Sequence, residues 1–545
     1  MKGPAVGMPT PEMAPLPTTL PAAALPNGNP APRSRPATQP IRPIVKLTLQ
    51  EVIHRTVINS LDVRVAGYQP AIDELRILEE EGAFDPSIFL SPSLQRQFPQ
   101  GVIPTSLNPN ELMTQVVSGG LRQKFLSGGQ AELKYQAQRY NFQKPVGIFN
   151  TALVRDTVWD NQVVLQITQP LLQNYGEEIN RAKITIARND QKISQLDFRS
   201  ALEKQIQTVE ETYWKLLIAQ RDVQIQSQLL MDTESTLDTI IRRMRVDATP
   251  LNVSQVRSSA EQRNASLIDA RGQLGSLSDD LKRLMSDPQF PPGGPEIIVP
   301  ADAPIEEPVR FSLADQIGTA LHNRLELLQQ LLRIDSALTV IKAARNNMLP
   351  QLNLQGQVGV EGWGNGPNES FEQMVETQLF NYAIGLQFEV PLGNRVARAI
   401  YQRTLLQHME AVLEYQRLAQ LVITEVSKAQ RELDTSWQLM DATRRATFAA
   451  RDALEQYQKR EGGSQPLTPE FLQLKLQLQS DLANAQRQEI QSVARYNIAL
   501  SALELAKGTL LRYNNIVMKE EKGPKRAMLA TMSTAAADAK AKKRR

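Results

Sequence analysis

One stretch of the chain, from Asn161 to Met244, changes its hydrophobic period once and then keeps the new period over a very long distance. From Asn161 to Thr168, apolar residues fall at every second position, which is the period of a strand with one apolar face. After Pro170, from about Glu177 onward, they follow alternating steps of four and three, which is a heptad seam. The seam residues are Leu202, Ile206, Val209, Tyr213, Leu216, Val223, Leu230, Leu237, Ile241 and Met244.

The length of this seam excludes a core helix of an ordinary globular domain. At about 1.5 Å per residue, a helix from Glu177 to Met244 is roughly 100 Å long. A strand that leads into such a helix indicates two environments stacked end to end, one suited to β-structure and one suited to a tube of coiled-coil helices. We therefore predict a mainly α fold with a β part.

The chain contains this plan twice. Leu313–Asn323 repeats the pattern of Leu49–Asn59 at an offset of 264 (313 − 49), and Pro350 repeats Pro86 at the same offset (350 − 86). Two matches at one offset indicate an internal duplication. In each copy, the sequence pattern predicts a helix, a pair of strands and a long helical hairpin. In the first copy, the opening helix should continue past Asn59 and end before Gly82.

The strand pair of the second copy spans residues 351–390. Its apolar residues, which alternate with polar ones, are Leu352, Leu354, Val358, Val360, Tyr382, Ile384, Leu386, Phe388 and Val390. Strands of about ten residues with one apolar face suit a membrane β-barrel. A soluble sheet with one buried face is the alternative that alternation alone leaves open. Four strands from one chain cannot close a barrel, so a barrel would need several chains.

The first copy carries an insertion between its two strands. Each returning strand ends at a Pro-Leu pair, and Pro391 follows Pro170 by 221 residues (391 − 170), so the insertion has 43 residues (264 − 221) within about 99–160. A Gly128-Gly129 turn is followed by apolar residues that alternate with polar ones, namely Ala131, Leu133, Tyr135 and Ala137. We predict an extra hairpin or a long loop here.

The second long helix, from about Arg395 to Glu461, resembles the first in length and in its seam. Its seam residues are Val422, Val426, Ala429, Leu433, Met440, Ala450, Leu454 and Tyr457. The first long helix should end at a turn near 247–253 and the second at a turn near 462–471, because both segments contain helix-breaking residues.

A helix returns from each of these turns, over about Val253–Leu284 in the first copy and Glu470–Leu511 in the second. Asn252 or Thr468 can cap the helix that follows it. Each copy therefore ends in a helical hairpin.

Composition divides the chain further. Residues 1–46 form a Pro-rich leader, 47–285 the first repeat, 286–310 a Pro-rich connector, 311–512 the second repeat and 513–545 a basic tail. We expect the leader and the tail to be disordered, with an interaction tail as the alternative for the latter. The leader has no basic segment followed by an apolar one, so either it is only a leader or a signal peptide lies upstream of this start.

Several classes of function are disfavoured. The chain has no cysteine, and its three histidines, His54, His322 and His408, are far apart in sequence, which argues against a metal site or a catalytic centre. The net charge of +3 arises from 61 basic and 58 acidic residues, so no nucleic-acid partner is indicated. We find no cofactor motif, no phosphate-binding loop and no nucleophile with a base, so an enzyme is the least favoured class.

The order, duplication and spacing of these features resemble the outer-membrane efflux protein family, the TolC-like outer-membrane factors. The resemblance extends from about Leu47 to Leu511. It is carried by the opening Leu-Thr-Leu-x-Glu-Val-Ile, by the helix-to-strand run and by the two strand-to-helix turns. These segments are Leu47–Ile53 with Asn59, Ala343–Leu352, Ile167–Leu171 and Val390–Leu392.

The resemblance implies a homotrimer in which an α-helical barrel continues into a 12-stranded outer-membrane β-barrel, with four strands per chain. It implies a passive export duct of a tripartite efflux or type I secretion system, with the strands in outer-membrane lipid and the helices in the periplasm. The hairpin tips would form the gate and dock a periplasmic adaptor (membrane fusion protein) and an inner-membrane pump. The tip residues are Thr249, Pro250, Leu251, Asn252, Gln465, Pro466, Leu467, Thr468 and Glu470.

The sequence departs from the family at the tips. Many relatives carry an acidic residue where this chain has Asn252 and another where it has Gln473, while Glu470 keeps an acidic position. The alternative function is a soluble coiled-coil scaffold or a periplasmic adaptor without a pore. Adaptors usually have one helical hairpin per chain, whereas this chain has two that are joined by alternating strands. A channel for metal ions is not supported, because no Met or His array is present.

Overall fold

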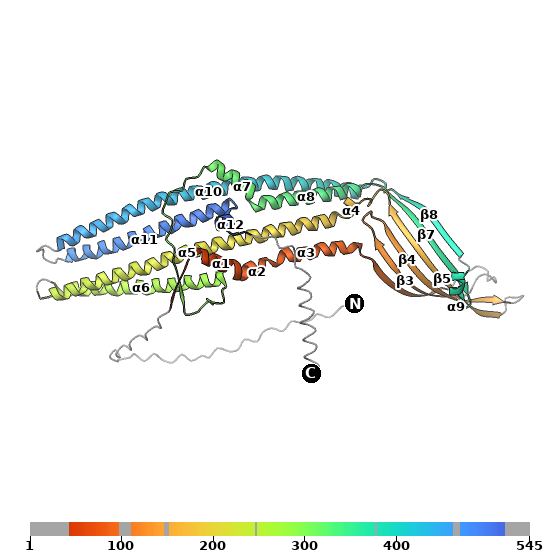
Figure 1. The fold of residues 1–545 in the computed structure, drawn as a ribbon, viewed down its shortest axis with the longest axis horizontal. Coiled ribbons are helices and arrows are strands. Elements are labelled where there is room, and N and C mark those ends of the chain that lie inside the picture. The colour runs from red at the N-terminus through yellow and green to blue at the C-terminus, as the bar shows by residue number, and fades with distance from the viewer. Residues whose placement is uncertain are drawn as a thin grey trace, which may run out of the picture. The chain divides into compact units, whose positions relative to one another are not determined.

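A computed structural model of the protein describes residues 43–97, 111–146, 152–245, 248–376, 379–461 and 469–517. From Ile44 onward the described residues form one unit, in which long helices lead into a six-stranded sheet (Figure 1). The prediction of a mainly α fold with a β part is confirmed. The leader before Pro43 and the tail after Val517 lie outside the described residues.

In both copies, opening helices precede the strands and a long helical hairpin follows them. The helices of the first copy are α1 (Leu49–Asn59), α2 (Leu61–Ala66), α3 (Tyr68–Glu81), the 3₁₀ turn η1 (Gly82–Phe84), α4 (Glu177–Asn180), α5 (Ala182–Arg243) and α6 (Pro250–Met285). Those of the second are α7 (Leu313–Asn323), α8 (Leu325–Asn346), α9 (Pro367–Glu376), α10 (Arg395–Glu461), α11 (Pro469–Ala506) and α12 (Leu510–Tyr513). The bounds of α1 and α7 differ by the offset of 264 found in the sequence.

The expected continuous opening helix is wrong, because it is broken after α1. Ser60 has a ψ of 125°, which is extended, and a second break falls at Gly67. The same break occurs in the second copy, where Arg324 has a ψ of 124° between α7 and α8. The first long helix is also interrupted once, at Arg181 between α4 and α5.

The sheet is antiparallel in the order β2-β3-β4-β5-β7-β8. Its strands are β2 (Ser87–Gln97), β3 (Glu111–Lys124), β4 (Gln130–Val146), β5 (Ala152–Pro170), β7 (Gln351–Gly364) and β8 (Leu379–Glu389). The expected four strands per chain are therefore wrong. The insertion forms the hairpin β3–β4, whose turn places Gly128 at a φ of +91°.

The connector contains structure that we did not predict. β6 (Ile297–Pro300) pairs in parallel with β1 (Ile44–Leu47), and Ile298 and Val299 are buried. This pairing ties the start of the first copy to the segment that joins the two copies.

The predicted seam of α5 is correct in its first half and is displaced by one residue in its second, where Val223, Leu230 and Leu237 are only partly buried. Leu202, Ile206, Val209, Tyr213 and Leu216 are buried, but Ile241 and Met244 are exposed. In the second half, the buried residues are Gln226, Leu229, Thr233, Thr236 and Ile240. These residues keep the heptad spacing but lie one position earlier than the predicted seam, because the partners of α5 change along its length: residues of α1 pack against its first half, and Val256, Leu472 and Leu476 pack near its end.

The seam of α10 follows the prediction more closely. The buried positions along α10 include Val422, Val426, Leu433, Met440, Leu454 and Tyr457. Several of them pack against α11 in one hydrophobic cluster.

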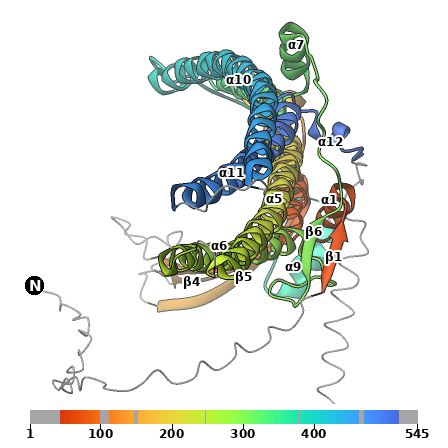
Figure 2. The same cartoon turned by 90° about the vertical axis from the view of Figure 1, so that its left-hand side faces the viewer.

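The long helices lie side by side in a fixed order. Next to the sheet this order is α3, α5, α8 and α10, and toward the hairpin turns it is α6, α5, α11 and α10. Figure 2 shows the second order end-on, with α10 and α6 at its two sides.

Candidate functional site

The register of the sheet joins apolar residues into rows that cross all six strands. One row consists of Ile88, Leu121, Leu133, Leu165, Val358 and Tyr382. The next row on the same face consists of Leu90, Gly119, Tyr135, Val163, Val360 and Phe380. Because side chains alternate between faces along each strand, these rows make one face of the sheet apolar.

This apolar face is exposed. Ile88 is 86% exposed, Leu133 47% and Tyr382 73%. At one end the face is covered by α9, which Asn161 contacts through an Nδ2 hydrogen bond of 3.1 Å to the carbonyl oxygen of Pro367. A contiguous apolar face of this extent marks a surface that meets lipid or another protein.

The opposite face of the sheet is polar. An ion pair of 2.8 Å joins Arg122 on β3 to Glu132 on β4, and Gln355 donates to Gln387 at 2.8 Å. A row of polar residues crosses the strands beside them, and it contains Ser91, Ser118, Gln136, Gln162 and Glu361. The sheet therefore separates an apolar environment from an aqueous one.

The two edges of the sheet, β2 and β8, each have one neighbour among the described strands. Both edges are long, and β8 carries exposed apolar residues on one face, namely Phe380, Tyr382, Ile384, Leu386 and Phe388. Soluble proteins avoid long edges of this kind, because unpaired backbone groups there invite pairing with another chain.

The first hairpin turn lies between α5 and α6. Pro250 occupies the first turn of α6, and the Thr249 hydroxyl oxygen accepts a hydrogen bond of 3.3 Å from the backbone N–H of Asn252. Thr249, rather than Asn252, is thus the cap. Leu251 is 71% exposed, whereas Asn252 is 1% exposed and its carboxamide has no hydrogen-bond partner within the described part of the chain.

Only part of the second turn falls within the described residues. Glu470 lies in the first turn of α11 and is exposed, while Gln465, Pro466, Leu467 and Thr468 lie outside the described residues. Beside this turn, the rings of Tyr457 and Phe471 stack with centroids 4.4 Å apart.

A small cluster of apolar residues packs the two hairpins together just behind their turns. Its members are Ile240, Val256, Leu472 and Leu476, with Leu237, Ala248 and Val253 at its margin. The described parts of the two hairpins are thus in contact just behind their turns.

Arg263 on α6 bridges three helices behind this cluster. Its guanidinium donates to the hydroxyl of Thr233 on α5, and on α11 to Gln479 Oε1 and to the carbonyl oxygen of Leu476, at 3.0 Å each. Burial lowers its pKa, and Asp232 opposes this shift. We did not identify Arg263 from sequence, because an arginine on a helix normally faces water.

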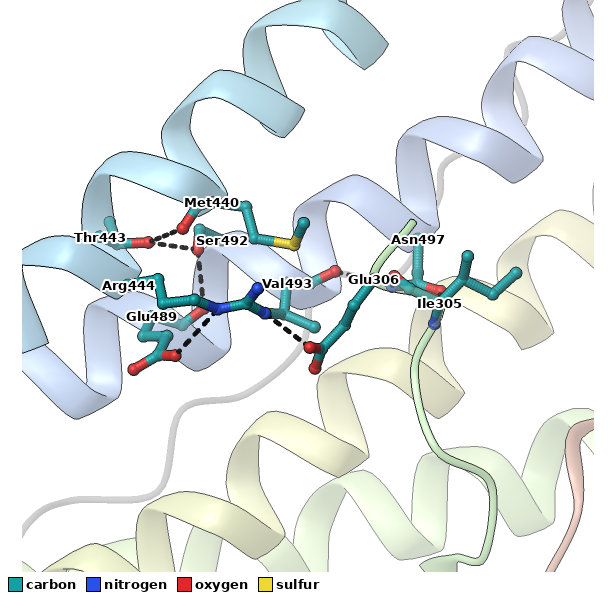
Figure 3. A network of polar contacts seen from close by, with 9 residues as sticks. All are labelled: Ile305, Glu306, Met440, Thr443, Arg444, Glu489, Ser492, Val493 and Asn497. Atoms are coloured by element: carbon teal, nitrogen blue, oxygen red, sulfur yellow. Dashed lines mark hydrogen bonds and ion pairs between the residues drawn. The ribbon is translucent and has the colours of Figure 1, made fainter. Parts of the chain in front are cut away.

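The connector is fastened to the second hairpin by a polar network (Figure 3). Arg444 on α10 pairs with Glu306 of the connector at 2.5 Å and with Glu489 on α11 at 3.7 Å. Asn497 on α11 accepts from the backbone N–H of Ile305 at 2.9 Å and donates to its carbonyl oxygen at 3.1 Å. The connector is thus attached to α10 through Arg444 and to α11 through Asn497.

A second point of attachment lies on α5. The Tyr213 hydroxyl is 3.1 Å from the carbonyl oxygen of Leu47 and 3.0 Å from the Asp302 carboxylate, and it accepts from the N–H of Ala301 at 3.2 Å. Burial raises the pKa of Tyr213. The hydroxyl therefore stays protonated and joins β1, the connector and α5.

Glu210 on α5 is a buried carboxyl group, with 1% of the residue exposed. It accepts hydrogen bonds from the hydroxyl of Ser501 and from Nδ2 of Asn514, the latter at 2.7 Å. Burial raises its pKa, and these two hydrogen bonds oppose the shift. Its partners are neutral side chains that link α5 to the end of the second copy, which is a structural role.

The described residues contain no group of three or more His, Cys, Asp or Glu side chains that could hold a metal ion. Among the helices that the structure describes, none is both long and apolar enough to cross a membrane.

Comparison with known proteins gives one family. The family model described as outer membrane efflux protein matches residues 128–286 and 316–509. Among curated proteins, none matches this sequence.

Solved structures share the fold. The CmeC outer membrane channel of Campylobacter jejuni is 14% identical with a TM-score of 0.61, covering 86% of this chain and 90% of that one. A membrane protein from Pseudomonas aeruginosa is 17% identical with a TM-score of 0.61, covering 88% and 97%. The outer membrane protein VceC of Vibrio cholerae is 15% identical with a TM-score of 0.58, covering 84% and 96%.

Proposed function

This chain belongs to the outer membrane efflux protein family, and from that premise we propose that three copies close into one passive export duct. The strands would form a barrel in outer-membrane lipid, and the helices would form a tube through the periplasm. The duct performs no chemistry of its own. It serves a tripartite efflux or type I secretion system, and the number of three copies is taken from the family resemblance.

The observation that carries this proposal is the exposed apolar face of a sheet whose two edges have no partner among the strands that the structure describes. In a bilayer, each backbone N–H and C=O must be paired, so an open sheet has to be closed by further copies. An apolar outer face and a polar inner face are what such a barrel requires, because lipid meets one and water the other.

The helices support the same mode of closure. β2 and α3 lie at one side of the copy and β8 and α10 at the other, by the order of contacts. Both side helices expose apolar residues: Val65, Tyr68, Ile72, Leu75 and Leu78 in the α1–α3 segment, and Leu406, Met409 and Leu413 on α10. A neighbouring copy would bury both stripes while it pairs both strand edges.

The hairpin turns are the proposed contact with the periplasmic adaptor and the inner-membrane pump. Leu251 projects from the first turn into solvent, and Glu470 gives the second turn an exposed carboxylate. An exposed leucine and an exposed carboxylate suit a partner with an apolar patch and a basic residue.

The alternative of a soluble scaffold or adaptor without a pore predicts that the apolar face lies against another part of a soluble assembly. The two hypotheses can be distinguished by placing a charged side chain at one of two adjacent residues of β5. Leu165 lies on the apolar face and Gln166 on the polar face.

A pair of matched variants tests the duct. We expect Leu165→Lys to prevent stable membrane insertion, because lysine on a lipid-facing strand costs about 2–4 kcal/mol at mid-depth. Gln166→Lys should insert and conduct in planar lipid bilayers as the parent protein does. Recovery of the parent protein in the soluble fraction, or bilayers without conductance steps for the parent and for Gln166→Lys, would contradict the proposal.

A further inference from the structure

The hairpin β3–β4 lies inside the sheet, between two strands that the internal repeat identifies as a pair. β2 follows Pro86 as β7 follows Pro350, and β5 ends at Pro170 as β8 ends just before Pro391. β7 and β8 are direct neighbours in the second copy, whereas β3 and β4 separate β2 from β5 in the first. The insertion therefore widens the sheet by two strands.

The inserted strands take part in both faces of the sheet. Leu121 on β3 and Leu133 on β4 continue the apolar row between Ile88 and Leu165, and both are exposed. On the polar face, Arg122 and Glu132 form the ion pair described above. A hairpin that stood outside the membrane would not need an apolar face aligned with that of its neighbours.

Strand direction allows closure with six strands per copy. Each neighbouring pair is antiparallel, so β2 and β8 run in opposite directions. β8 of one copy can therefore pair in antiparallel fashion with β2 of the next, as in membrane barrels with an even number of strands. On β8, the apolar stretch from Phe380 to Phe388 has the length that a tilted strand needs to cross the bilayer.

We propose that each copy contributes six strands to the membrane, so that three copies close a barrel of eighteen strands in place of the expected twelve. This inference rests on the proposed trimeric duct. Because barrel diameter grows roughly in proportion to strand number, the membrane section is about half as wide again as a twelve-stranded barrel. The widening applies to the membrane section alone, because the insertion adds two strands and no helix.

Disulfide trapping can test the strand order, because the native chain contains no cysteine. Ser91 faces Ser118 across β2 and β3, and Gln136 faces Gln162 across β4 and β5. We expect Ser91→Cys with Ser118→Cys, and Gln136→Cys with Gln162→Cys, to form disulfides within one chain. Ser91→Cys with Gln162→Cys should not, because three strand spacings, roughly 14 Å, exceed the reach of a disulfide.

The edge contact between copies needs a second set of variants. Ser91→Cys on β2 is combined in turn with Asn381→Cys, Ala383→Cys and Gln387→Cys on β8. All four positions lie on the polar face of the sheet. We expect one combination to link copies into a ladder of dimers and trimers on a denaturing gel. Leu90→Cys with the same partners is the control, because its side chain lies on the opposite face.

The trapped protein is first reduced and shown to conduct in planar bilayers, so that each gel reports on a folded channel. A disulfide between positions 91 and 162 in a conducting protein would overturn the inference, because β2 would then pair with β5 directly and leave twelve strands. That result would leave the duct itself intact. Failure of every variant, and of the parent, to conduct would instead overturn the proposed function and the inference with it.

Discussion

Arg263 holds two helical hairpins together with one side chain. Its guanidinium, on α6, donates hydrogen bonds to Thr233 on α5 and to Gln479 and Leu476 on α11. A planar group with five donors can do this, and a lysine cannot satisfy the same acceptors at once. The hairpin ends therefore depend on a polar contact as well as on the apolar cluster around Val256.

Removal of this guanidinium should loosen the turn region first. We expect Arg263→Met to lower the free energy of unfolding by about 2–4 kcal/mol, because charge-assisted hydrogen bonds are lost and buried acceptors remain. Hydrogen exchange should accelerate in α11 near Leu476 while the sheet is unchanged. Arg271→Met removes an exposed arginine of the same helix and is the control. Equal effects of the two variants would show that Arg263 has no special role.

Glu210 makes the stability of the helical part depend on pH. Because burial raises its pKa above the ordinary value of 4.5, the folded protein keeps this proton to a higher pH than the unfolded chain does. Its contribution to the free energy of unfolding therefore falls as the pH rises from about 4.5 through the raised pKa, and then stays level.

We expect Glu210→Gln to remove this titration. The unfolding temperature of the variant, relative to that of the parent, should then rise as the pH is increased from about 5 to about 8. The corresponding change in the free energy of unfolding is about 1.4 kcal/mol for each unit by which the pKa of Glu210 is raised. Glu234→Gln, at an exposed position of the same helix, is the control for the loss of a negative charge. A difference that is constant over this pH range would show that Glu210 is not perturbed.

At the scale of secondary structure elements, the hydrophobic period and the internal repeat predict where the long helices begin and end. The bounds of α10 follow from the change of period at Arg395 and the glycines after Glu461, and the repeat offset places α7 on α1. The family membership was also accessible, because it rests on the order and spacing of several short segments.

Other elements lack such a signal. β6 pairs with β1 across more than 250 residues, so neither strand has a local partner in the sequence. The alternation after Gly128 indicated a hairpin or a loop, but not that the hairpin would lie within the sheet, because the neighbours of a strand are set by tertiary pairing. The Arg263 contacts likewise join residues up to 216 positions apart.

Two adjacent glycines of β3 test the pairing of the inserted hairpin. A methyl group at Gly120 would lie 2.2 Å from the backbone oxygen of Leu133, whereas at Gly119 it would lie 3.4 Å from Cδ1 of Leu90, an ordinary contact. We expect Gly120→Ala to reduce the yield of heat-resistant oligomer severalfold and Gly119→Ala to resemble the parent, as measured on gels without boiling. The reverse ranking would show that β3 and β4 do not pair in this register.

The first hairpin turn makes a prediction about binding. Leu251 is exposed and makes no contribution to the cluster behind the turn, so we expect Leu251→Asp to weaken cross-linking to the periplasmic adaptor about tenfold without loss of oligomer. Leu251→Met keeps an apolar side chain and should bind as the parent does. Unchanged adaptor cross-linking and export in Leu251→Asp would mean that this turn is not the docking surface.

On the scale of the whole molecule, one copy is incomplete. Among the described strands, its sheet has two edges without a partner, and its apolar face is exposed, while its outer helices expose apolar stripes at the same two sides. One operation, the addition of identical neighbours on both sides, satisfies all of these surfaces at once.

The most direct test of this account is the protein mass of the detergent-extracted membrane fraction by light scattering, combined with electron microscopy of the same sample. We predict about 183 kDa, three times the 60.9 kDa of one chain, in particles that form a hollow tube longer than the roughly 100 Å helices. A mass of one chain, or recovery of the protein from the soluble fraction, would contradict the account.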